Sequence, residues 1–329
     1  MRVQSSSGDL IADRRYSYGQ ALAQAGDHAA AAELFAQAIE RAPAWAPAFH
    51  ALGRARLCCF DRAGAVAAFR DCLRLDPEDR LGASLDLARL DAAVTVDAAP
   101  AAYVAALFDA YAPDFENALV ERLHYTAPTT IAAKVRAAAP AGAPHRFARA
   151  LDLGCGPGLA GEALRLDIGY LEGVDLAEGM IAVARGKGVY DSLRQDDILA
   201  HLLGPGAPFD LILAADVFPY IGDLARIIAA MGAKLTPGGL AAFSVEKAGA
   251  EDWTLRESLR FAHSEDYLRR LAAQASLAVV TIEETVLRKD RGAEIVGLVA
   301  ILKAEATAAA REQAALARVC AGERMASSK

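Results

Sequence analysis

Long apolar runs, paired cysteines and an excess of basic residues are all missing from this 329-residue sequence. No run approaches the roughly 18 consecutive apolar residues of a membrane span, and the opening letters MRVQSSSGDL lack a signal-peptide core. The five cysteines show no C-x-x-C pair and no histidine at a metal-ligand spacing, so we expect reduced, mostly buried thiols. These absences lead us to expect a cytoplasmic protein with no membrane segment, no disulfide framework and no bound metal.

Charge and composition narrow the class further. A net charge of −7 and a pI near 5.5 argue against a general affinity for nucleic acid or for anionic membranes. The content of 54% hydrophobic, 23% charged and only 7% aromatic residues is typical of a globular protein whose apolar bulk is largely alanine. The length allows about two domains of ordinary size.

The first 80 residues contain a repeat with a period of 34 residues. Three residue types recur at this offset: Gly19, Phe35 and Pro43 in one unit, and Gly53, Phe69 and Pro77 in the next. The period is that of tetratricopeptide repeats, in which two helices pair as a hairpin. Small residues let the helices approach, phenylalanine fills the gap and proline ends each second helix. Phe60 departs from the pattern, because it stands where glycine is usual.

A third stretch, RLGASLDLARLDA, keeps the helical spacing but loses the repeat signature, so it is interpreted as a capping helix. Residues 1–95 are then an all-α helical-repeat domain. Such an array presents a concave face to a protein or peptide, forms a homodimer, or only packs against its own chain. The sequence leaves these three possibilities open.

After a small-residue linker at 96–102, residues 103–304 alternate apolar strands with helical segments, and 305–329 form a tail. Strands are predicted at 149–153, 170–176, 192–198, 209–217, 239–246, 278–287 and 294–302. The linker RKDRGA is too short for a crossover helix, so the last two strands must form an antiparallel hairpin. The prediction is a doubly wound seven-stranded α/β sheet, with six parallel strands and an antiparallel last strand.

The glycine-rich stretch LDLGCGPGLAG follows the first strand and permits two interpretations. Its last six letters, GPGLAG, fit the dinucleotide pattern G-x-G-x-x-G, whereas DLGCGPG fits an acidic residue followed by G-x-G-x-G. In either case the glycines let the backbone approach a ligand, and Asp175 at the end of the second strand can bind ribose hydroxyls.

The remaining motifs separate the two interpretations. Five motifs follow one another along the chain: LDLGCGPG, GVDLAEGMIAVAR, RQDDI, FDLILAADVFPYI and LTPGGLAAFSVE. With them, residues 103–304 resemble a class I S-adenosylmethionine-dependent methyltransferase, which has a Rossmann-like fold. The repeats in front make the whole chain resemble bacterial methyltransferases that carry tetratricopeptide repeats.

This resemblance implies an S-adenosyl-L-methionine site. Gly154, Gly156 and Gly158 would lie against the methionine part, and Asp152 would reach its ammonium group directly or through water. Asp175 would hold the ribose. The further implied contacts are Leu176, Met180, Asp197, Ile198 and Asp216. Asp196 is an equally acidic neighbour, but strand alternation allows only one of the pair to face the cofactor, and Asp197 is favoured.

The acceptor side is expected beyond the carboxyl ends of the parallel strands. His263, whose unperturbed pKa lies near neutrality, is the candidate base together with Asp216; the alternative is that His263 only packs beside Ser264, a good helix N-cap. Candidate acceptor contacts are Tyr111, Tyr125, Tyr220, Arg260, His263 and Arg288.

The main hypothesis is methyl transfer to O or N of an unidentified acceptor. A small molecule is favoured over a protein as the acceptor, because an enclosed pocket suits compact ligands. The alternative hypothesis is a repeat-based binding module whose second domain senses the cofactor or acts as a scaffold.

Overall fold

The computed structural model describes residues 6–91, 93–112, 125–139, 146–290 and 292–305. They form two compact units. One contains residues up to Tyr111 with Tyr220–Gly222 and Leu255–Phe261, and the other contains the remaining residues. Helix α6 (Ala101–Tyr111) thus groups with the repeats, and the predicted domain boundaries at 95, 102 and 304 stay predictions.

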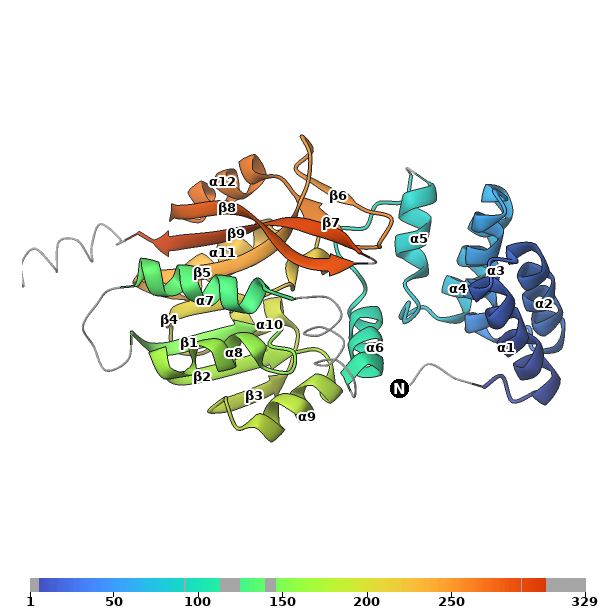
Figure 1. Cartoon of the computed structure of the whole chain (residues 1–329), viewed down its shortest axis with the longest axis horizontal. Coiled ribbons are helices and arrows are strands. Elements are labelled where there is room, and N and C mark those ends of the chain that lie inside the picture. The colour runs from blue at the N-terminus through green and yellow to red at the C-terminus, as the bar shows by residue number, and fades with distance from the viewer. Residues whose placement is uncertain (1–5, 92, 113–124, 140–145, 291, 306–329) are drawn as a thin grey trace, which may run out of the picture. The chain divides into compact units, whose positions relative to one another are not determined.

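The first unit begins with helices that pair as successive hairpins (Figure 1). Their bounds are α1 (Leu10–Gln24), α2 (His28–Arg41), α3 (Ala46–Cys58), α4 (Arg62–Leu75) and α5 (Ala83–Leu90). The caps obey the 34-residue period, because Asp27 accepts a hydrogen bond from the Ala30 amide and Asp61 accepts one from the Gly64 amide. Helix α5 packs its leucines against the second hairpin, as a capping helix does.

Close helix approach within each hairpin depends on glycine, as the sequence predicts. A Cβ on Gly19 would lie 2.8 Å from the Phe35 ring, and one on Gly53 would lie 2.6 Å from the Phe69 ring. Phe60 occupies the glycine position of the second turn at a φ of 62°, with 95% of its surface exposed. A phenylalanine in this left-handed conformation is unusual, and its exposure explains how the turn accommodates the ring.

The Gly53→Ala variant is expected to lower the free energy of unfolding by about 1–3 kcal/mol, because the added methyl group displaces the buried Phe69 ring. Gly186→Ala is the matched control. Gly186 lies in helix α9 (Glu178–Lys187), where a Cβ would meet nothing within 4 Å, so alanine should stabilise that helix by up to about 1 kcal/mol. Urea unfolding of both variants measures the difference, and equal midpoints would contradict the close-contact argument.

The second unit is built on a mixed sheet (Figure 1). Its strands are β1 (Phe147–Leu153), β2 (Ile168–Asp175), β3 (Ser192–Gln195), β4 (Phe209–Ala214), β5 (Leu235–Lys247), β8 (Leu277–Asp290) and β9 (Ala293–Ala304). Strands β3, β2, β1, β4 and β5 are neighbours in that order and parallel. Strand β9 pairs antiparallel with both β5 and β8. The predicted hairpin and the antiparallel last strand are confirmed.

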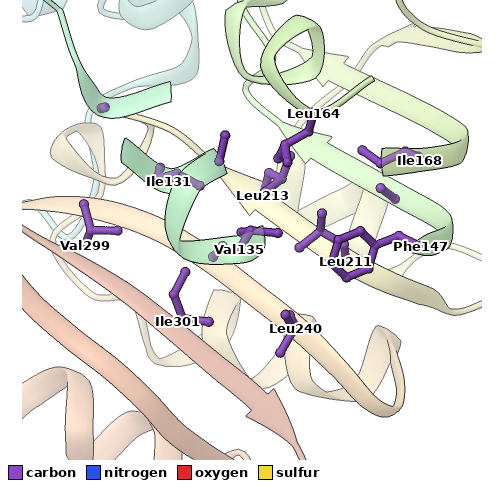
Figure 2. Packing of buried hydrophobic residues seen from close by; sticks show 14 of the residues in the cluster. Ile131, Val135, Phe147, Leu164, Ile168, Leu211, Leu213, Leu240, Val299 and Ile301 are labelled. Atoms are coloured by element: carbon purple, nitrogen blue, oxygen red, sulfur yellow. The ribbon is translucent and has the colours of Figure 1, made fainter. Parts of the chain in front are cut away.

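Helices cover the sheet on both faces (Figure 1). Helix α7 (Ala127–Ala138) and helix α8 (Leu159–Leu164) lie on one face, and α10 (Ile198–Leu203), α11 (Ala225–Lys234) and α12 (Glu265–Gln274) form the other layer. In Figure 2, Ile131 and Val135 of α7 lie over Leu213, Leu240 and Ile301 of three strands. Alternating strand residues thus bury one apolar face, which holds the strand ends in fixed positions.

The strand prediction is wrong in two respects. Strand β3 ends at Gln195 and not at Ile198, so Asp196 and Asp197 lie beyond it and strand alternation does not choose between them. Two short strands that the sequence did not predict, β6 (Trp253–Leu255) and β7 (Phe261–His263), follow β5. Strand β7 extends the sheet, because it pairs in parallel with the end of β5.

The thiols are less buried than expected. Cys72 and Cys155 are buried, but Cys58 and Cys59 are exposed at the end of α3. No helix in the described part of the chain combines the length and the apolar character needed to cross a membrane.

Candidate functional site

The glycine loop lies between β1 and α8. Gly154, Gly156 and Gly158 all have positive φ values, of 60°, 52° and 95°, a conformation that favours glycine. A Cβ on Gly154 would lie 2.5 Å from Val217, which follows β4, whereas one on Gly156 would meet nothing within 4 Å. The loop is therefore tight against the protein at Gly154 and open at Gly156.

Asp175 ties this loop to the end of β2. Its Oδ2 accepts a hydrogen bond of 2.9 Å from the Gly156 amide, and its Oδ1 accepts one of 2.8 Å from the Ala177 amide. The carboxylate is 9% exposed. Two backbone amides therefore hold this carboxylate in place at the end of β2, beside the glycine loop.

Asp152 lies at the buried side of the same loop and is 1% exposed. The hydroxyl of Tyr190 donates to its Oδ2 over 2.7 Å, while Oδ1 takes no hydrogen bond from any residue that the structure describes. Burial raises the pKa of the Asp152 carboxyl to about 7, and the Tyr190 hydrogen bond opposes that rise. An orphaned buried carboxylate oxygen is suited to a cationic or N–H-bearing ligand group.

Four of the predicted cofactor contacts surround the ends of β2 and β3. Met180 is fully buried and Ile198 is 7% exposed, whereas the Leu176 side chain is half-buried. Asp197 is exposed and caps α10 by accepting hydrogen bonds from the Leu199 and Ala200 amides. Its carboxylate thus has a local structural function whether or not it also contacts adenine.

Asp216 belongs to a buried charge cluster at the carboxyl end of β4. Its Oδ1 accepts a 2.9 Å hydrogen bond from Arg288, and Arg288 also donates to Glu246. Arg288 and Glu246 are 4% and 2% exposed, while the Asp216 side chain is 14% exposed. The Asp216 amide donates to Ser244, and a φ of 59° places this aspartate in the left-handed region. Sequence reasoning named Asp216 and Arg288 separately and missed Glu246, for which the sequence held no signal.

His263 ends β7 and is fully buried. Its ring stacks on Tyr267 with 6.2 Å between centroids, and Tyr267 donates its hydroxyl to Asp223. Ser264 caps helix α12 by accepting from the Tyr267 amide, as the sequence alternative expected. His263 is thus held inside the packing of this unit.

Three predicted acceptor contacts belong to the unit that contains the repeats. Arg260 lies over the Tyr220 ring at 5.4 Å, and Phe108 contacts the same ring edge-on. Tyr111 is 53% exposed at the end of α6. Tyr125 packs instead beside the core of the sheet, and residues 113–124, between the two predicted contacts Tyr111 and Tyr125, lie outside the described residues.

Comparison with known protein families identifies the kind of domain that contains the glycine loop. The family model for a methyltransferase domain matches residues 150–239, and the model for a tetratricopeptide repeat matches residues 12–44. The chain carries a methyltransferase domain behind a tetratricopeptide repeat. The methyltransferase domain includes the glycine loop, Asp175 and Asp216.

Two curated proteins illustrate the similarity. The chain is 36% identical over 125 residues to a ubiquinone biosynthesis O-methyltransferase of Xylella fastidiosa (strain 9a5c), covering 33% of this chain and 50% of that protein. It is 33% identical over 150 residues to a trans-aconitate 2-methyltransferase of Methylobacterium nodulans, covering 45% and 56%. The chain spans about half the length of these curated relatives.

Among solved structures, an S-adenosylmethionine-dependent methyltransferase from Clostridium acetobutylicum ATCC 824 is similar at a TM-score of 0.45 and 17% identity. That similarity covers 60% of this chain and 99% of the other.

Proposed function

We propose that this protein transfers a methyl group from S-adenosyl-L-methionine to an oxygen or nitrogen of a small-molecule acceptor. The observation that carries the proposal is the joint arrangement of the open Gly156 position, Asp175 and the orphaned Oδ1 of Asp152. These residues are suited to the chemical groups of the cofactor, since they offer backbone without a side chain at Gly156 and two carboxylates in different environments.

Each residue has a distinct part in holding the cofactor. Asp175 would accept hydrogen bonds from the ribose hydroxyls, and Asp152 would face the amino group. Gly156 leaves room for the amino-acid part, while Leu176, Met180, Asp197 and Ile198 border the adenine. When bound, S-adenosylmethionine supplies an electrophilic methyl carbon on a sulfonium sulfur.

The chain has to align the acceptor and, where the acceptor is protonated, to take its proton. Asp216 is better placed for this than His263, because it is partly accessible and lies two residues after the end of β4, next to Val217, which packs on Gly154. His263 is fully buried against Tyr267 and would need local opening to reach an acceptor. The maximal rates of the Asp216→Asn and His263→Gln variants compare the two roles directly.

A small acceptor is favoured over a protein side chain by the curated relatives, whose names specify ubiquinone biosynthesis and trans-aconitate. Tyr111, Tyr125, Tyr220 and Arg260 stay predicted acceptor contacts. Arg288 already bonds to two carboxylates of the chain, those of Asp216 and Glu246. These bonds support a role in holding Asp216 in place over a role in binding the acceptor.

Calorimetry and turnover together test the function. We expect the purified full chain to bind S-adenosylmethionine and S-adenosylhomocysteine, and to transfer labelled methyl groups to a component of fractionated cell extract. Protein that takes up neither ligand would refute the proposal. Binding without transfer to any small-molecule or protein fraction would instead favour the scaffold hypothesis.

The repeats support an additional interaction with a protein or peptide, or a homodimer. Helix α1 exposes Ile11 and Tyr18, seven residues apart on one helix face. A sedimentation series over protein concentration distinguishes self-association from a monomer with a free repeat face. Truncation at residue 95 is a poor test, because Tyr220–Gly222 and Leu255–Phe261 belong to the same unit as the repeats.

A further inference from the structure

Tyr190 precedes β3 and occupies a socket made of three glycines. A Cβ on Gly158 would lie 3.0 Å from its ring, one on Gly173 would lie 2.8 Å away, and one on Gly161 would lie 2.6 Å from its hydroxyl oxygen. Gly158 is the N-cap residue of helix α8, Gly161 lies within that helix and Gly173 lies in β2. Any larger residue at these positions would have to displace the tyrosine, so the socket selects for this ring in this place.

The socket aims the Tyr190 hydroxyl at Asp152. The hydroxyl donates to Oδ2 over 2.7 Å, and burial raises the pKa of Tyr190 above its ordinary value, so the phenol keeps its proton and remains a donor. One oxygen of Asp152 thus bonds to Tyr190, while the other, Oδ1, is buried without a hydrogen-bond partner among the described residues. A hydrogen bond to one oxygen of a carboxylate also fixes the plane in which the other oxygen lies.

We propose that Tyr190 is a positioning residue of the cofactor site, which orients the Asp152 carboxylate so that Oδ1 receives the amino group of the cofactor's amino-acid part. This inference rests on the proposed function. It assigns a role to a residue that lies 38 positions from Asp152 in the sequence and outside the glycine motif.

The same contact controls the charge of Asp152. Burial and the nearby Asp175 carboxylate raise its pKa, and the Cys155 thiol, whose own pKa burial also raises, faces it from the loop. The Tyr190 hydroxyl and the Gly161 amide lower the Asp152 pKa. Loss of the hydroxyl therefore raises that pKa further. A protonated Asp152 cannot pair with an ammonium group, so ligand affinity falls as the pH falls through the pKa of Asp152, and in the variant this decline begins at higher pH.

Isothermal titration of the full chain with S-adenosylhomocysteine tests the proposal. We expect Tyr190→Phe to weaken binding about tenfold at neutral pH, the usual effect of losing one hydrogen bond to a charged group. The pH below which affinity declines should be higher in the variant than in the wild type, because the variant raises the pKa of Asp152. We expect this difference in the range of about pH 6 to pH 8. Tyr170→Phe is the matched control, because Tyr170 lies near the start of β2, with its ring beneath Arg149, whereas Asp175 ends that strand.

A double-mutant cycle supplies the second readout. In an Asp152→Asn background, Tyr190→Phe should have little further effect on affinity, and the pH dependence in this range should disappear. Gly161→Ala, which pushes on the hydroxyl without removing it, should weaken binding in the same direction; this variant serves as the test if Tyr190→Phe melts at a much lower temperature than the wild type.

The outcomes separate the two levels of inference. Wild-type protein that binds no S-adenosylhomocysteine would overturn the proposed function itself. Wild-type binding together with an unchanged affinity and pH profile for Tyr190→Phe would overturn only the role of Tyr190. A loss of affinity that is equal at every pH and additive with Asp152→Asn would indicate a purely structural tyrosine and would also overturn it.

Discussion

Asp175→Ala is expected to lower the affinity for S-adenosylhomocysteine by about 100-fold or more, because two hydrogen bonds from ribose hydroxyls to a carboxylate are lost together. The structure adds a second reason. Asp175 also accepts the amides of Gly156 and Ala177, so its removal takes away one of the hydrogen bonds that join the glycine loop to β2. Calorimetry at constant pH measures the loss.

Asp210→Ala is the control for this variant. Asp210 likewise accepts two backbone amides, those of Ala148 and Arg149. It lies near the start of β4, however, whereas Asp175 lies at the end of β2. Its loss should lower stability without changing ligand affinity. If both variants bound as the wild type does, the ribose would have to lie elsewhere.

The second large effect is on stability. We expect Arg288→Met to lower the free energy of unfolding by about 3–5 kcal/mol, because it leaves the buried Glu246 and the half-buried Asp216 without their shared counter-ion. The long methionine side chain fills most of the space, so the effect reports charge and not a cavity. Urea unfolding monitored by circular dichroism gives the value.

Arg269→Met provides the comparison for an exposed pair. Arg269 bonds to Glu265 one helical turn away, with both side chains more than 40% exposed, so its loss should cost about 0–1 kcal/mol. Similar values for the two arginine variants would contradict the view that the Asp216–Arg288–Glu246 cluster is a buried structural unit.

The sequence alone predicted the parts of the molecule that depend on local patterns. The helical repeats follow from Gly53 and Phe69, since a residue without Cβ and a ring at a fixed offset report the close approach of two helices. The glycine loop and Asp175 follow from the strand-loop-helix-strand order, which brings the end of β2 beside the loop after β1 in a parallel sheet. The end of the third strand was predicted wrongly because Asp197 caps helix α10, and a short polar stretch does not reveal such a cap.

The tertiary structure alone decided how the site is held and which groups are accessible. Tyr190 meets Asp152 across 38 positions, and Arg288 meets Asp216 across 72 and Glu246 across 42. Contacts of this range depend on side-chain packing between strands and helices, for which no local spacing exists. The burial of His263 has the same origin, because it results from an unpredicted short strand and a stacked Tyr267. The order of the elements along the chain was thus determined by sequence pattern, whereas the charges and hydrogen bonds at the site were determined by three-dimensional packing.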